Sequence, residues 1–244
     1  RLRDIVTKNS YPSSELIEVE QVTDEWPYLY LQKRMIPSLY YWYAILLVLL
    51  CIITAKRDKI TLTKADINLQ SVHFFCLGIA FMLLETHGVT SAAMFISNSW
   101  QVNGAVISGI LVMILFANAT LSFIKSPYLI GYGGILICLL LRIYLDLDFL
   151  RDSSLLARYI AVGILTGLPV YFSGLVFIAS FSDSPSRHQA LGANFLGSLV
   201  GGMLQSLTLV IGIASMLWLI LALYGISAFF KPGSFYRRVA PKIS

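Results

Sequence analysis

The sequence predicts an all-α integral membrane protein: a polytopic bundle of about seven transmembrane helices after a short N-terminal remnant of a soluble domain. Of the 244 residues, 57% are hydrophobic and only 13% are Asp, Glu, Lys or Arg, whereas soluble domains average about 45–50% and 25%. The mean hydropathy is +0.75. The apolar residues also come in runs long enough to cross a bilayer, which excludes a soluble domain, a disordered chain and a coiled coil.

The first 36 residues differ from all that follow, because they are rich in charge. The segment 13–20 has the pattern of a short exposed strand. We therefore expect residues 1–36 to be the tail of a soluble domain and its junction with the membrane. The chain begins with Arg and shows no signal-peptide pattern, so we expect the native polypeptide to extend upstream. Trp26 and the segment 28–30 should lie against the membrane face or a partner.

The transmembrane region is expected to span residues 37–230. Its first run, 37–54, begins with a proline that suits a helix start and carries an aromatic belt at residues 40–43. Four further runs are each close to the roughly 20 residues that a bilayer core about 30 Å thick requires. These runs are 71–92, 100–123, 128–145 and 157–181.

The last apolar stretch, 189–230, contains 42 residues and no charged group. It is too long for one helix and long enough for two, so we expect a tight turn near Gly212 and a total of seven spans. A basic tail, 231–244, follows.

The basic residues lie mostly in the connections between apolar runs, where they set membrane orientation. Fewer of them fall on the side of residues 1–36 than on the opposite side, so the seven-span arrangement places the C-terminal tail in the cytoplasm. We expect a bacterial-type inner (plasma) membrane. The predicted partners are the lipid bilayer and other membrane protein subunits, and no nucleic acid.

A resemblance to a known family rests on four segments. Thr23 to Leu31 (TDEWPYLYL), followed by Ile36-Pro37, resembles the junction in multi-spanning spermidine-synthase-like (aminopropyltransferase-related) membrane proteins. Segments of this chain similar to the family's C-terminal helix bundle are 78–88, 167–174 and 191–197. The resemblance implies a Rossmann-type domain joined to membrane helices. Its acidic catalytic residues would lie before Arg1, so no residue of this chain is expected to be catalytic.

Intramembrane polar residues are the next candidates for function. Glu85 lies well inside an apolar run, and an ionised group there costs at least roughly 2.5–3.5 kcal/mol unless it faces the bundle or water. It is either a proton or cation relay, a polar clamp on a substrate, or a structural hydrogen-bonding group. The candidate partners are Arg142, Asn103 and Asn118. Asn118 matches a glycosylation sequon, but within a span it is expected to act as a packing amide.

No cofactor or metal is expected. His73 and His87 are fourteen residues apart on one helix face, a spacing that suits two haems, but the chain has too few histidines for the second axial ligands. The cluster Gly131-x-Gly133-Gly134 follows no strand, so it is interpreted as helix packing rather than a phosphate loop. The three cysteines have no partner spacing for a disulfide or zinc site.

A stripe of small residues in the sixth expected span predicts unusually close helix packing. Its members are Ala193, Gly197, Gly201 and Gln205. The stripe is a candidate for a dimer seam or subunit contact, although packing within one bundle is the commoner outcome, and we expect the fifth or seventh span as its neighbour. In the fifth span, Pro169 predicts a kink and a freed carbonyl one turn earlier.

Three functional classes follow. The first is the membrane-embedded domain of a spermidine-synthase-like protein, which anchors or serves an upstream domain. The second is a non-catalytic accessory subunit of a larger membrane complex. The third is a small-amine transporter with Glu85 as its cation site; an inverted repeat of spans would favour it, and none is found.

Overall fold

The computed structural model describes residues 23, 26–28, 30–57, 69–95, 100–145 and 153–231. Among these residues every regular element is a helix, which confirms the predicted all-α class. The strand expected in segment 13–20 and the basic tail from residue 232 lie outside the described residues.

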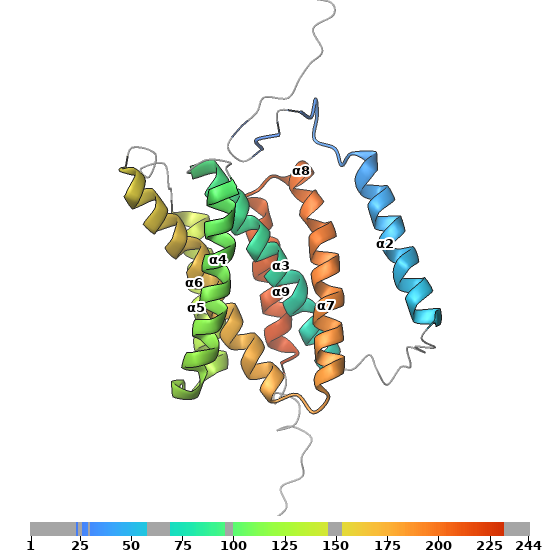
Figure 1. The fold of residues 1–244 in the computed structure, drawn as a ribbon, viewed down its shortest axis with the longest axis vertical. Coiled ribbons are helices and arrows are strands. Elements are labelled where there is room, and N and C mark those ends of the chain that lie inside the picture. Colours follow the sequence, from blue (N-terminus) through green and yellow to red (C-terminus); the bar gives the residue numbers. More distant parts are fainter. Residues whose placement is uncertain are drawn as a thin grey trace, which may run out of the picture.

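The helices follow the apolar runs of the sequence closely. Figure 1 shows how they are arranged. Their bounds are α2 Ser38–Arg57, α3 Leu69–Phe95, α4 Trp100–Thr120, α5 Pro127–Tyr144, α6 Leu155–Ser182, α7 Arg187–Leu204, α8 Thr208–Ile211 and α9 Ser215–Phe229. Two 3-10 turns, Leu121–Phe123 and Gln205–Leu207, extend α4 and join α7 to α8.

Within the part of the chain that the structure describes, five helical segments are long and apolar enough to cross a membrane, which supports an integral membrane protein. They are Leu69–Ala93, Val106–Phe123, Pro127–Tyr144, Leu156–Ser182 and Arg187–Ile211. The other two expected spans correspond to shorter apolar helices, Ser38–Leu50 within α2 and Ser215–Phe229. The 15 residues of α9 rise only about 22 Å along the axis, less than the roughly 30 Å of a bilayer core. Length and composition therefore give five candidate spans among the described residues, and the expected count of seven is not confirmed.

Local sequence explains where several helices begin and end. Pro127 occupies the start of α5, where its missing N–H removes no helical hydrogen bond. The hydroxyl of Ser154 accepts a bond from the Ala157 amide at the start of α6. Gly212 ends α8 with a φ of 85°, a conformation that favours glycine. The expected turn near Gly212 is therefore present, and α9 follows it.

Helix α3 lies at the centre of the bundle. It contacts α4, α6, α7 and α9, and its Phe74, Leu77 and Leu83 are among the most buried side chains of the described residues. Large apolar side chains on α4, such as Leu115 and Phe116, are exposed instead, as a lipid-facing surface requires. Helix α2 stands apart from this bundle, beyond α7 (Figure 1).

Candidate functional site

The small-residue stripe of α7 packs against α3 at backbone distance. A Cβ atom placed on Gly197 would overlap the carbonyl oxygen of Phe75, and one placed on Gly78 would overlap the carbonyl oxygen of Asn194. The two helices therefore touch through their main chains, which only glycine permits. The predicted close approach is confirmed for Gly197.

The neighbour of this stripe differs from the one expected. Helices α6 and α9 were expected because they adjoin α7 in sequence, but the closest packing is against α3. At Gly201 an added Cβ would lie 2.8 Å from the carbonyl oxygen of Ile79 and 3.0 Å from the Cβ of Met82. The physical reason is that α3 has a glycine of its own, Gly78, opposite the stripe, so both helices have a small residue where they meet. Ala193 belongs to the same apolar core.

Polar bonds cross this α3–α7 seam. The Thr86 hydroxyl of α3 donates to the Gln205 side-chain oxygen at 2.6 Å. Thr86 is therefore the partner in the hydrogen bond between helices that was expected of Gln205. The Ser198 hydroxyl of α7 approaches the Gly78 carbonyl oxygen at 3.4 Å and the Asn194 carbonyl oxygen, within its own helix, at 3.1 Å. Such bonds between membrane helices contribute about 0.6 kcal/mol on average.

Glu85 is half-buried on α3, one residue before Thr86. Its carboxylate makes no hydrogen bond or ion pair with the described residues, so the expected pairing with Arg142 is not formed there. Arg142 lies instead in a small cavity with His87, which is two residues along α3 and therefore points to a different side of the helix.

That cavity has a volume of about 20 Å³ and lies between α3, α5, α6 and α9. Its polar lining consists of His87, Ser91, Cys138, Arg142 and Thr166. His87 is only 7% exposed. Its Nε2 lies 3.4 Å from the Ser91 hydroxyl, while its Nδ1 has no hydrogen-bond partner among the described residues.

Pro169 also lines this cavity, together with Leu165. Helix α6 continues through the proline from Leu155 to Ser182. Because Pro169 has no N–H, the Leu165 carbonyl loses its helical donor, as expected from the sequence. Leu165 and His87 therefore line the same cavity. The sequence alone does not predict that they lie together.

The two asparagines do not gather around Glu85. Asn103 is half-buried, and its side-chain oxygen has no hydrogen-bond partner among the described residues. Asn118 is exposed on α4, so it is not packed inside the bundle of this chain. The reason is the helix rotation, since its neighbours Leu115, Phe116 and Ala119 are also exposed.

A second polar cluster surrounds His73 near the other end of α3. Its Nδ1 lies 2.8 Å from the Ser227 carbonyl oxygen and its Nε2 lies 2.9 Å from the Ser180 hydroxyl. Because a carbonyl only accepts, a neutral imidazole in this geometry carries its proton on Nδ1 and accepts from Ser180. The Tyr132 hydroxyl extends the cluster to Ser227 at 3.0 Å. His73 therefore ties four helices together.

Apolar packing separates the two histidines. Ala80 and Leu83 lie between them on α3 and are fully buried, and Leu84 is nearly so. Both ring nitrogens of His73 are occupied by protein groups. The two histidines therefore form separate polar clusters rather than one continuous polar path.

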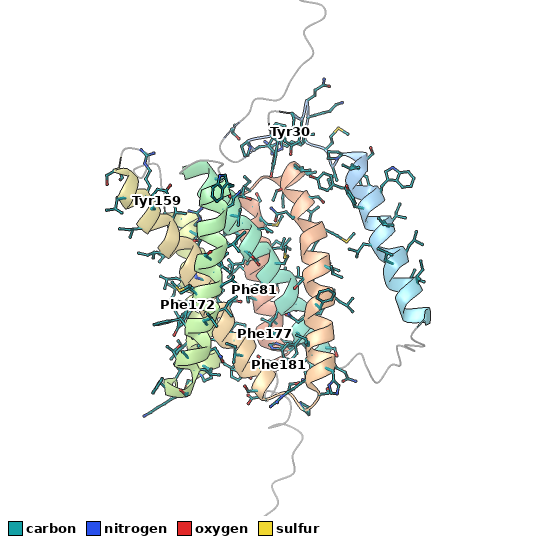
Figure 2. The ribbon with its side chains drawn as sticks, in the orientation of Figure 1. Tyr30, Phe81, Tyr159, Phe172, Phe177 and Phe181 are labelled. Carbon is teal, nitrogen blue, oxygen red and sulfur yellow. The ribbon has the colours of Figure 1, made fainter. Side chains whose placement is uncertain are left out.

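The glycine cluster on α5 packs against α6. A Cβ on Gly134 would overlap the ring of Phe172, which is labelled in Figure 2, and one on Gly131 would lie 2.5 Å from Val176. Its interpretation as helix packing is confirmed for these two glycines, whereas Gly133 faces open space.

The segment before α2 is fixed to one end of the bundle. Trp26 is fully buried, and its indole N–H donates to the Leu209 carbonyl oxygen at 2.8 Å. That carbonyl lies in the last turn of α8, where carbonyl groups have no helical N–H partner because the helix ends at Gly212. The Tyr28 hydroxyl donates to the Thr208 hydroxyl at 2.7 Å. Burial raises the pKa of Tyr28, so the phenol stays protonated as a donor.

A groove of about 590 Å³ lies between α2 and the seam of α3 and α7. The α2 wall includes Tyr40, Tyr43 and Leu47. The opposite wall includes Ser198 and Gly202 of α7 and Ser206 of the 3-10 turn after it. The small residues of α7 thus serve two surfaces, since Gly197 and Gly201 face α3 while Gly202 has open space around it.

Comparisons of the chain with protein-family models, with curated proteins and with solved structures find no match.

Proposed function

We propose that this chain is the membrane-embedded domain of a spermidine-synthase-like protein, and that its helix bundle anchors an upstream aminopropyltransferase-type domain. The observation that carries the proposal is the docking of Trp26 and Tyr28 on α8. These residues belong to the junction segment TDEWPYLYL, on which the family resemblance rests.

The docked junction gives the anchor a mechanical basis. A flexible tether would let an upstream domain move freely, whereas a buried indole with a hydrogen bond at the end of α8 fixes the chain where it leaves the bundle. Arg34 adds a second contact, because its guanidinium lies 5.8 Å from the centre of the Trp26 ring. In this proposal the upstream domain is held at the α8 end of the bundle, at a defined distance from the membrane.

The proposal includes two further features. Residues 1–36 are the remnant of the soluble domain, and α2 and α9 also cross the membrane, which gives seven spans. In this proposal the bilayer thins locally around α9, as it does around helices shorter than its core. The polar connections on either side of α2 and the turn at Gly212 support alternating crossings. The location proposed is a bacterial-type inner membrane.

A second function is favoured by the groove beside α2. Its wall of Ser198, Gly202 and Ser206 would let another helix approach closely, as an accessory subunit of a larger complex requires. The transporter alternative has less support, because neither of the two cavities described above is lined by Glu85.

Purification of the native protein from its own membrane tests these functions against each other. The anchor function predicts one polypeptide of intact mass well above 27.1 kDa, with an aminopropyltransferase-type domain upstream of Arg1. A native chain of this mass alone would contradict the anchor function. A stoichiometric set of other membrane proteins in the preparation would support the accessory subunit instead.

A further inference from the structure

The cavity beside His87 combines features that a helix-packing site does not need. Four helices contribute to its wall, yet its volume of about 20 Å³ is not filled by a side chain. A cavity holds a water molecule when it offers about 10–15 Å³ and two to four polar partners. The volume thus suits one water molecule and is too small for an organic ligand.

His87 is the polar residue of the cavity that indicates a bound molecule. Its side chain is only 7% exposed, and its Nδ1 has no hydrogen-bond partner among the described residues. The weak contact at Nε2, 3.4 Å from the Ser91 hydroxyl, leaves the ring poorly satisfied within the protein. Buried polar atoms in folded proteins are nearly always bonded to protein or to ordered water.

A second partner comes from the main chain of α6. Pro169 lacks the N–H that would bond the Leu165 carbonyl, and both residues line the cavity. In membrane helices, carbonyl groups freed by proline are commonly satisfied by ordered water or neighbouring side chains. The Thr166 hydroxyl donates to the Val162 carbonyl oxygen at 2.7 Å, so its remaining capacity is as an acceptor.

We propose that this cavity binds a single water molecule, which bridges His87 Nδ1 on α3 and the Leu165 carbonyl on α6. The water donates one hydrogen to the carbonyl. Its other bond, to Nδ1, is a donation or an acceptance according to the tautomer of the ring. Among the described residues, Arg142 lines the cavity and no Asp or Glu does, which argues against a metal cation as the occupant. The bridge satisfies the proline-containing helix and the buried histidine together.

Solid-state NMR of the protein in liposomes, with ¹⁵N-labelled histidine, tests this site directly. We expect a correlation between water protons and a ring nitrogen of His87. His73 is the internal control without water, because both its ring nitrogens bond to protein groups. His188 is exposed and serves as the control with bulk water. Absence of the His87 correlation, with that of His188 present, would overturn the proposal, and it is also the result that a bound chloride ion would give.

A Pro169→Ala variant tests whether the Leu165 carbonyl is the second hydrogen-bond partner of the water. Alanine restores the N–H that bonds the Leu165 carbonyl, so the water loses one partner and its correlation with His87 should weaken. Alanine favours the helix interior more than proline does, so the variant is expected to fold. An unchanged correlation in this variant would overturn the assignment of the Leu165 carbonyl as the second partner.

Discussion

Replacement of Gly197 gives the strongest test of the α3–α7 seam. An added Cβ would overlap the Phe75 carbonyl oxygen, which is part of the α3 backbone and cannot move without moving the helix. Even alanine must therefore push the two helices apart. Overpacking of this kind costs about 1–3 kcal/mol, and leucine should lie at or beyond the upper end of that range.

The assay is thermal unfolding of Gly197→Ala and Gly197→Leu in detergent. From the cost of overpacking and the size of the chain, the Tm should fall by roughly 2–12 °C, more for leucine than for alanine. Native-membrane assembly provides a second readout, because a loosened seam should also weaken contacts made by α7.

Gly192→Leu and Gly202→Leu are matched controls on the same helix. Both glycines have open space at the Cβ position, and replacing an interior glycine favours the helix by up to about 1 kcal/mol. These variants should be neutral or stabilised. A Gly197→Ala protein as stable as the original would show that α3 and α7 do not touch at Gly197, and the packing argument would be refuted.

Three further experiments test the polar groups of the bundle by the same thermal assay. Thr86→Val and Gln205→Leu, combined in a double-mutant cycle, should show a coupling of about 0.6 kcal/mol, and a coupling of zero would mean that the bond does not form. Glu85→Gln should leave the Tm unchanged or raise it, since the carboxylate has no bonded partner among the described residues; a loss as large as that of Gly197→Leu would contradict this. His73→Phe should lower the stability by about 1–3 kcal/mol, because it leaves Ser180 and the Ser227 carbonyl without their partner, and an unchanged Tm would show that the cluster is not structural.

The sequence predicts the helices well, because their signal is the length of each apolar run. The turn at Gly212 was predictable for the same reason, since 42 uncharged residues cannot form one span and glycine supports the positive φ of 85°. Close packing of Gly197 and Gly201 was also predictable, because small residues at helical spacing have few other uses in a membrane helix.

Neighbours across the bundle could not be predicted in this way. The sequence shows the small stripe of α7 but not that Gly78 completes it on α3, since chain order only weakly determines which helices pack together. The same limit applies to Asn118, whose exposure depends on the rotation of α4. It also explains why the four-helix cluster at His73 was missed, because Ser180 and Ser227 carry no signal of their own.

Photo-crosslinking from residue 28 in the native membrane tests the docked junction most directly. A benzophenone amino acid in place of Tyr28 should crosslink within the same chain to the α8 segment around Thr208, because the Tyr28 hydroxyl lies 2.7 Å from the Thr208 hydroxyl. The same amino acid in place of Trp42, which is 68% exposed on α2, should crosslink to lipid instead. The anchoring account predicts the α8 adduct from residue 28. Adducts from residue 28 only to lipid or to other proteins would contradict it.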